Sequence, residues 1–149
     1  MQLAPVELGM HPKPASQQGD ALGYVGWNQW MWVSNERDNT MGPISRTASL
    51  NGYSVTATAE VDRVVWDMGD GGSVSCGAGT PWRSSVAGNQ PSPDCGHVYE
   101  KDGEFTVTAT SYWTVTWSGI GETGSFGMEL SNSENHTVAE VQVVNVTGG

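Results

Sequence analysis

The strictest constraint on the fold is a long stretch, Glu104–Ser118, in which apolar and polar side chains alternate. A period of two places each set on its own face of a β-strand. Fifteen residues is long for a single strand, so we expect a bulge or bend near Ser111. No segment shows a helical period, which predicts an all-β chain.

Turn signals separate the other strand candidates. Asn51-Gly52 lies between Arg46–Leu50 and Tyr53–Glu60, and Asn-Gly favours the type I′ turn of a tight hairpin. Further strands are predicted at Trp27–Val33, Arg63–Met68, Ser73–Cys76, Ser125–Leu130 and His136–Val146. These short segments predict an Ig-like antiparallel β-sandwich of about seven to eight strands.

Residues 1–22 contain Pro5, Pro12 and Pro14 and are predicted to form a flexible tail rich in Pro and Gln, which leaves residues 23–149 as the domain. The length of 149 residues suits one such domain. The first 22 residues also lack the basic start and apolar middle of a signal peptide.

Charge and hydrophobicity argue against two classes of partner. Six Lys and Arg stand against 16 Asp and Glu, a net charge of −10. Phosphate contacts need clustered basic side chains, so a nucleic-acid partner is not expected. No apolar run approaches the roughly 18 residues of a membrane helix, so direct membrane insertion of this segment is not expected either.

Cys76 and Cys95 are the only cysteines. A disulfide is the first interpretation, with free thiols or a metal site near His97 as alternatives. A bridge would close the loop 77–94 at its base. It would also indicate a secreted or cell-surface protein whose export signal or anchor lies outside this chain or has been removed from it.

A more specific motif begins at Trp66-Asp67-Met68-Gly69-Asp70-Gly71 and continues in His97-Val98-Tyr99 and in Gly103 before Phe105-Thr106-Val107. This series resembles the PKD (polycystic kidney disease) domain family, whose pattern is W-D-F-G-D-G, H-x-Y and G-x-Y-x-V. Met68 and Phe105 replace the family's Phe and Tyr. With its cysteine-containing insertion, the chain looks like PKD-like modules in exported or membrane-anchored proteins of actinobacteria.

Each motif residue has a structural interpretation. Trp66 would anchor the core, and Asp67 and Asp70 would accept backbone N–H groups in a turn. Gly69 and Gly71 would supply backbone angles that other residues disfavour. We expect His97 to bond the backbone, and the hydroxyl of a buried Tyr99 to bond a carbonyl. Val107 would continue the strand.

Catalytic interpretations are weaker. Asp67 and Asp70 could be a glycosidase carboxylate pair, or Ser92, Asp94 and His97 a hydrolase triad, but no G-x-S-x-G motif accompanies them. We therefore expect no catalytic residue, no metal ligand and no cofactor. Calcium remains an alternative, although the loop acids are scattered without a D-x-[DN]-x-[DN]-G ladder: Asp20, Asp38, Asp62, Asp94 and Asp102.

Tryptophan is the most informative side chain for function. Trp27, Trp30, Trp32 and Trp82 either pack a second small core beneath the long loop or form a ligand platform, with Trp27, Trp30 and Trp82 as its exposed members. The sequence predicts a non-catalytic extracellular or cell-surface module for protein–protein interaction, adhesion or spacing. The alternatives are a carbohydrate-binding module and a subunit of a surface assembly that joins through an edge strand. The partner would be a protein or glycan at the cell surface, and the oligomeric state is left open.

Overall fold

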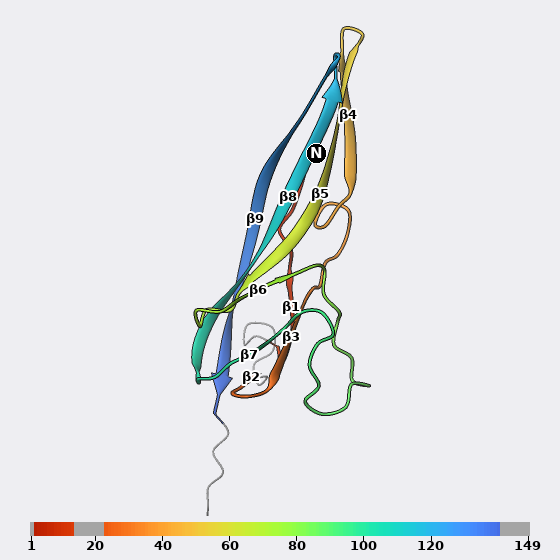
Figure 1. The fold of residues 1–149 in the computed structure, drawn as a ribbon. Helices are drawn as coiled ribbons and strands as arrows, with labels where there is room; N and C mark the ends of the chain where they lie inside the picture. The colour runs from red at the N-terminus through yellow and green to blue at the C-terminus, as the bar shows by residue number, and fades with distance from the viewer. Residues whose placement is uncertain (1, 14–22, 141–149) are drawn as a thin grey trace, which may run out of the picture.

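Figure 1 shows the computed structural model, which describes residues 2–13 and 23–140. The prediction of an all-β chain is confirmed, because these residues form nine strands and no helix. None of them therefore belongs to a helix with the length and apolarity needed to cross a bilayer. The strands are β1 (Leu8–His11), β2 (Gly23–Tyr24), β3 (Asn28–Val33), β4 (Ile44–Leu50), β5 (Tyr53–Asp67), β6 (Ser73–Cys76), β7 (Gly96–Val98), β8 (Gly103–Gly119) and β9 (Glu122–Ala139).

The strands of the described ranges form two sheets. The smaller sheet has the order β1-β3-β7, and the larger has the order β2-β9-β8-β5-β4, with β6 also paired to β5. Pairing is antiparallel except between β2 and β9, which run parallel. The larger sheet curls into a half-barrel, so the two even layers of the predicted Ig-like sandwich are not clearly formed.

The larger sheet is much longer than the smaller one. In Figure 1, β4 and the ends of β5, β8 and β9 extend away from the smaller sheet and taper towards two hairpin turns. We call this extension, residues 44–59 and 115–126, the arm, and we call the part where the two sheets overlap the body. The long strands follow from the sequence, since the alternation in β8 continues from the body into the arm.

The core of the body lies between the two sheets. Trp66 of β5 and Val107 of β8 are fully buried there, together with Leu8 and Met10 of β1 and Met31 of β3. We call the side of the larger sheet that carries Trp66 its inner face. The prediction that Trp66 anchors the core is therefore confirmed.

The expected irregularity of the long strand lies in its neighbour. β8 is continuous through Ser111, whereas the register of β5 against β8 shifts between Val61 and Arg63. The extra residue, Asp62, changes the parity of β5, so that Ala59 and Val64 both face inward. A bulge in β5 thus lets β8 keep one parity along its length.

Two other strand predictions have different outcomes. Asn51 and Gly52 have φ angles of 52° and 81°, which confirms the hairpin turn between β4 and β5. The two separate strands predicted near the C-terminus are one strand, β9. The polar residues 131–135 between them pair with β8 in the same unbroken register. Residues 141–146 of the predicted second strand lie outside the described residues.

The predicted N-terminal tail is wrong for residues 2–13. β1 pairs with β3 in the register Leu8↔Val33, and Val6, Leu8 and Met10 are buried against the core. These apolar residues alternate with Glu7 and Gly9, a short strand pattern between prolines. Residues 14–22 of the predicted tail lie outside the described residues.

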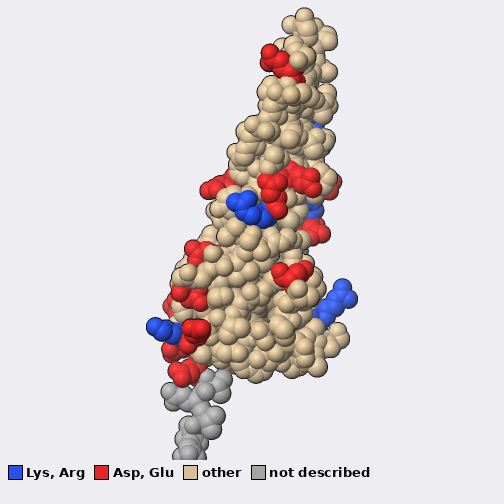
Figure 2. Space-filling view, in the orientation of Figure 1, with Lys and Arg blue, Asp and Glu red and all other residues tan. Residues whose placement is uncertain are grey.

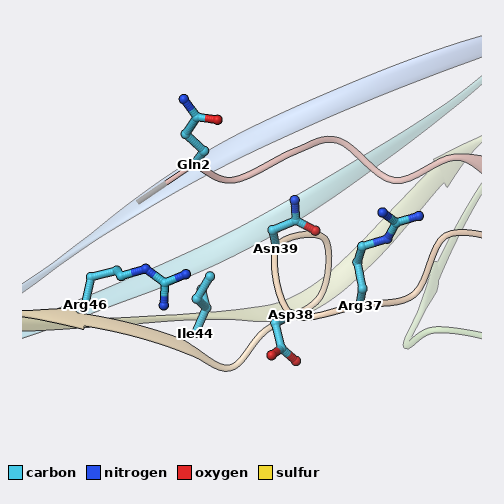
Figure 3. A pocket seen from close by; sticks show the side chains of 6 residues that line it. All are labelled: Gln2, Arg37, Asp38, Asn39, Ile44 and Arg46. Atoms are coloured by element: carbon cyan, nitrogen blue, oxygen red, sulfur yellow. The ribbon is translucent and has the colours of Figure 1, made fainter.

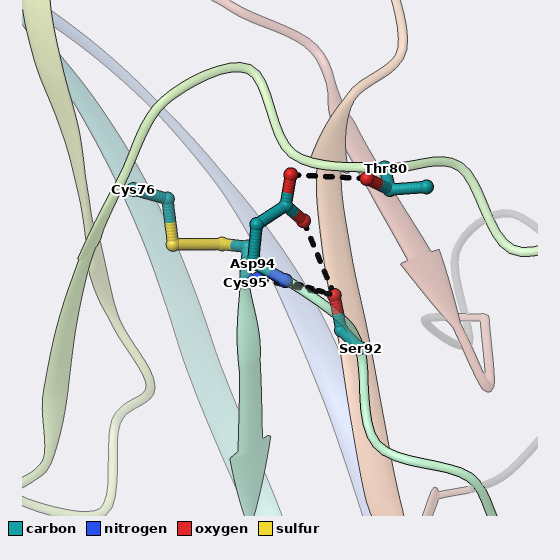
Figure 4. Close-up of a disulfide and its surroundings, with 5 residues drawn as sticks. All are labelled: Cys76, Thr80, Ser92, Asp94 and Cys95. Carbon is teal, nitrogen blue, oxygen red and sulfur yellow. Dashed lines mark hydrogen bonds between the residues drawn. A yellow bond between two sulfur atoms is a disulfide. The ribbon is translucent and has the colours of Figure 1, made fainter.

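Cys76 and Cys95 form a disulfide, as predicted. Figure 4 shows the hydrogen bonds beside it, where the Asp94 carboxylate accepts from the Thr80 hydroxyl at 3.0 Å. The Ser92 hydroxyl accepts from the Cys95 N–H at 3.0 Å. The loop is therefore closed at its base by one covalent bond and by polar contacts between its two ends.

Removing the disulfide should destabilise the protein. Closing a loop with a sequence separation of 19 restricts the unfolded chain, and the entropy model gives about 3 kcal/mol for a loop of this size. We expect the double variant Cys76→Ser/Cys95→Ser to lose about that much free energy of unfolding in urea titrations. Reductant should destabilise the wild type and leave the variant unchanged; equal stability of wild type and variant would contradict the prediction.

Replacing Trp66 by Ala should cost about 3–5 kcal/mol, because it empties a fully buried ring site. Val65→Ala is the matched control, since Val65 is the next residue of β5 and faces the other side of the sheet. Urea unfolding of both variants measures the difference. A loss for Trp66→Ala no larger than that for Val65→Ala would show that Trp66 is not the anchor.

Candidate binding site

The disulfide-closed loop covers the outer face of the smaller sheet. Near its start, the Val33 N–H of β3 donates to the Ala78 carbonyl at 2.7 Å, and Gly79 forms a bridge with Trp32. A Cβ on Gly79 would lie 2.6 Å from the Met31 carbonyl oxygen. Glycine at position 79 thus lets the loop approach β3 closely.

The end of the loop returns to the same strand. The Asn28 N–H donates to the Asn89 side-chain oxygen at 2.7 Å, and the Asn28 amide donates to the Asn89 carbonyl at 2.9 Å. The Trp30 indole N–H donates to the Gln90 carbonyl at 2.7 Å. Both ends of the loop are therefore fixed to β3, and the space between them is held open.

A pocket of about 280 Å³ lies between this loop and the smaller sheet. Its walls come from the end of β1, the turn before β3, β3 itself and the loop. We call it the aromatic pocket, and its lining residues are His11, Pro12, Tyr24, Trp27, Asn28, Trp30, Trp82, Gly88, Asn89 and Gln90.

Aromatic rings dominate the pocket walls. His11 stacks on Trp82 with ring centroids 3.5 Å apart and an interplanar angle of 4°. Tyr24 and Trp27 form a second pair at 6.1 Å, tilted by 55°. Partial burial, together with the nearby positive charge of Lys13, lowers the pKa of His11 from its usual value. The imidazole is therefore neutral at pH 7, and none of the residues that line the aromatic pocket is Asp, Glu, Lys or Arg.

The structure brings three of the four predicted platform residues together. Trp27 is 45% exposed at the mouth of the pocket, and Trp82 is half-buried in its stack with His11. The expected exposure of Trp30 is wrong: only 6% of it is exposed, because the loop covers its ring and Gln90 accepts its N–H. The two alternatives for these tryptophans therefore coexist, with Trp30 beneath the loop and Trp27 at the surface.

Trp32 lies outside the aromatic pocket. A Cβ on Gly9 of β1 would come within 2.2 Å of the Trp32 indole nitrogen, so the ring packs across the smaller sheet at that glycine. Sequence reasoning missed His11, because it assigned residues 1–22 to a tail. The pairing of Asn28 with Asn89 carried no local signal, since the two asparagines are 61 residues apart.

A buried polar network supports the pocket from behind. The Gln29 amide nitrogen donates to the Pro12 carbonyl at 2.8 Å, and its oxygen lies 2.9 Å from His136 Nε2. Gln29 and His136 are both buried. Gln29 thus connects a pocket residue, Pro12, to β9 of the larger sheet.

The corner that resembles the PKD motif is separate from the pocket and serves the backbone. Asp67 accepts the Gly69 N–H and Asp70 accepts the Gly72 N–H, each at 2.9 Å, as predicted. Gly69 and Gly71 have φ angles of 80° and 92°, also as predicted.

The tyrosine of this motif is buried, and its hydroxyl donates to the Met68 carbonyl at 2.8 Å, which confirms the prediction for Tyr99. Its ring stacks on Phe105. Gly103 opens β8 with a φ of 143°.

His97 differs from its prediction. Its Nε2 lies 2.7 Å from Asp70 Oδ2, so its partner is a side chain and not the backbone. Partial burial raises the pKa of Asp70, but the hydrogen bonds from His97 and from the Gly72 N–H outweigh it and hold that pKa below its usual value.

The residues of the alternative hydrolase triad and of the alternative metal site do not converge. Ser92 and Asp94 bond to each other and to the loop backbone, whereas His97 pairs with Asp70. Within residues 2–13 and 23–140, no group of three or more His, Cys, Asp or Glu side chains is placed to hold a metal ion. Asp20 lies outside the described residues.

A second hollow lies at the root of the arm, where the N-terminal segment passes β4. Figure 3 shows its side chains, which are mostly polar: Gln2, Arg37, Asp38, Asn39, Ile44 and Arg46. The two arginine side chains do not point towards each other, and the Arg46 guanidinium donates to the Ser45 carbonyl. The hollow therefore lacks the convergent groups that mark a specific site.

No protein-family model, curated protein or solved structure matches the chain. The resemblance to the PKD family consequently remains a prediction from the motif. The aromatic pocket has to be interpreted from its own chemistry.

The buried His136 should make stability depend on pH. Its Nδ1 has no hydrogen-bond partner, and burial lowers its pKa to about 4 from an ordinary value near 6.5. The unfolded state therefore takes up a proton at a higher pH than the folded state does. The contribution of His136 is fully present above about pH 6.5 and is lost as the pH falls towards 4, by about 3 kcal/mol in all.

Urea unfolding between pH 7.5 and pH 4 tests this prediction in the wild type and in His136→Gln, with pH values chosen on either side of the usual histidine pKa of about 6.5. The glutamine can still donate to Gln29, so the variant should fold and show a flatter pH profile. Parallel profiles for the two proteins would contradict the assignment.

Proposed function

We propose that this chain is a non-catalytic, exported binding module whose aromatic pocket receives a sugar ring of a surface glycan. The observation that carries the proposal is the convergence of Trp27, Trp82 and Tyr24 with amide side chains in one uncharged pocket. The module would serve adhesion or interaction at a cell surface, which is the broader role that the sequence predicts.

The chemistry of the pocket suits a neutral sugar. A pyranose ring has apolar C–H faces that pack on aromatic rings, and hydroxyl groups around its edge that need hydrogen-bond partners. Exposed Trp27 offers such a ring, and the amides of Asn28, Asn89 and Gln90 offer polar partners beside it. A volume of about 280 Å³ is close to the lower end of small-molecule sites, about 300 Å³, which suits one or two sugar rings.

Other observations support the remaining parts of the proposal. The disulfide is typical of exported proteins. The carboxylates of the PKD-like motif are engaged in turns, which supports a non-catalytic role. We also propose that the chain is a member of the PKD family and that its two-sheet body is an Ig-like sandwich. Both proposals rest on the motif and on the agreement of Asp67, Asp70 and Tyr99 with their expected roles.

Retention on insoluble polysaccharides, followed by titration with soluble oligosaccharides, tests the proposal. Tryptophan fluorescence should change on binding, because Trp27 and Trp82 lie at the site. Trp27→Ala and Trp82→Ala should each weaken binding by about tenfold or more. Tyr112→Ala is the control, because Tyr112 lies under Arg63 on the other face of the larger sheet and lines neither the aromatic pocket nor the inner face of the arm.

Three outcomes would contradict the sugar proposal. The first is no retention on a broad panel of polysaccharides and no spectral change. The second is retention that Trp27→Ala and Trp82→Ala leave intact. The third is capture of a protein partner, but of no glycan, that these two variants abolish; it would favour the protein-interaction role instead.

A further inference from the structure

The arm exposes an apolar face. Leu50 is 75% exposed and pairs directly with Tyr53, which is 62% exposed, so both lie on one side of the sheet. Phe126 is 54% exposed and pairs with Val115 of β8. Val115 in turn pairs with Ala59, which faces the same side of β5 as Tyr53, so Phe126 lies on that side too. This side is the inner face of the larger sheet, continued from the body into the arm.

The opposite face of the arm is polar. Hydroxyl groups pair across its strands, Ser45 with Thr58 at 2.7 Å and Thr47 with Thr56 at 2.8 Å. The contrast between the two faces is that of a sheet with one side in water and one side buried. The inner face of the arm therefore has the composition of a sheet face that is buried against another surface.

Within residues 2–13 and 23–140, the chain covers only the root of this face. Leu3, in the segment before β1, packs on the cluster of Ala59, Trp113 and Val115. Beyond Leu3, Leu50, Tyr53 and Phe126 stay exposed in the part of the chain that the structure describes.

The arm is also nearly uncharged. Residues 44–59 and 115–126 contain two charged side chains, Arg46 and Glu122. Both belong to the inner face, because Arg46 pairs with Ala57, and Glu122 pairs with Gly119, which pairs with Val55. Figure 2 shows the same contrast, with red and blue side chains spread over the body and almost none towards the tip of the arm. A partner for this face needs an extended apolar surface and at most one charge of each sign to complement Arg46 and Glu122.

We propose that a second copy of this chain docks on the inner face of the arm, so that two arms pack face to face. The second copy presents the required surface, apolar apart from one charge of each sign, and the contact would continue the packing that Leu3 begins. The smaller sheet stands on the same side of the larger sheet as this face, because the core of the body lies between them. Two copies with parallel arms would collide at their bodies, so the arms point in opposite directions.

The size of the face makes the contact reversible. Four strands spaced by about 4.8 Å, two of about seven and two of about five residues at 3.4 Å per residue, present roughly 390 Å² per copy in projection. Two copies together bury roughly 800 Å² if the sheet is treated as flat, which is below the size of stable interfaces, about 1,200 Å². The dimer should therefore form at micromolar to millimolar concentration and separate on dilution.

Sedimentation equilibrium over a wide concentration range tests the proposal, with two pairs of matched variants. Phe126→Glu and Leu50→Glu place a charge on the inner face. Ser125→Glu and Ser49→Glu place the same charge on the neighbouring residue, which faces the other way and is also exposed. The inner-face variants should weaken association by about tenfold or more, and the outer-face controls should not. All four positions are exposed, and thermal unfolding of each variant confirms that it is folded.

Several results would overturn the proposal. One is a wild type that stays monomeric at millimolar concentration. Another is association that all four variants leave unchanged, which would place the contact elsewhere, such as the free edge of β4. Flotation of the wild type with phosphatidylcholine vesicles, abolished by Phe126→Glu in a protein that does not self-associate, would assign the face to a lipid surface instead. Small-angle scattering of the dimer should show bodies at opposite ends; bodies side by side would contradict the antiparallel arrangement.

Discussion

The pairing of β5, β8 and β9 is the constraint on which the rest of the structure depends. Three long antiparallel strands gather most of their apolar side chains on one face of a sheet, and burying that face removes the apolar surface from water. In the body, the smaller sheet covers it, with Trp66 at the centre of the contact. At the root of the arm, Leu3 covers it. The remainder is the face that we assign to a second copy.

The disulfide-closed loop covers the outer face of the smaller sheet. This outer face carries Trp30 and Trp32, and the loop leaves Trp30 only 6% exposed, while Trp27 in the turn before β3 stays at the surface. The loop is held to β3 at both ends, so the space beneath its middle persists as a pocket and does not collapse. A long loop without secondary structure thereby becomes the wall of a candidate binding site.

The sequence predicted what local pattern determines. Alternation identified β8, Asn51-Gly52 identified the hairpin between β4 and β5, and the PKD-like motif placed Asp67, Asp70 and Tyr99 in the roles that they have. It could not show contacts made across the chain. The prolines concealed the strand pattern around Leu8, so the stacking of His11 on Trp82 was not foreseeable. Nor could the two-residue period of the side-chain pattern show how far β5 and β8 would extend beyond the smaller sheet.

One apolar face of the larger sheet is buried in the body and exposed on the arm, and a separate, partly open aromatic pocket lies between the disulfide-closed loop and the smaller sheet. Hydroxyl-radical footprinting of the dilute protein, read out by mass spectrometry for each aromatic side chain, measures this directly. The account predicts strong labelling of Trp27, Tyr53 and Phe126 and protection of Trp66 and Trp113. Labelling of Trp66 comparable to that of Phe126, or protection of Phe126 and Tyr53 in the monomer, would contradict it.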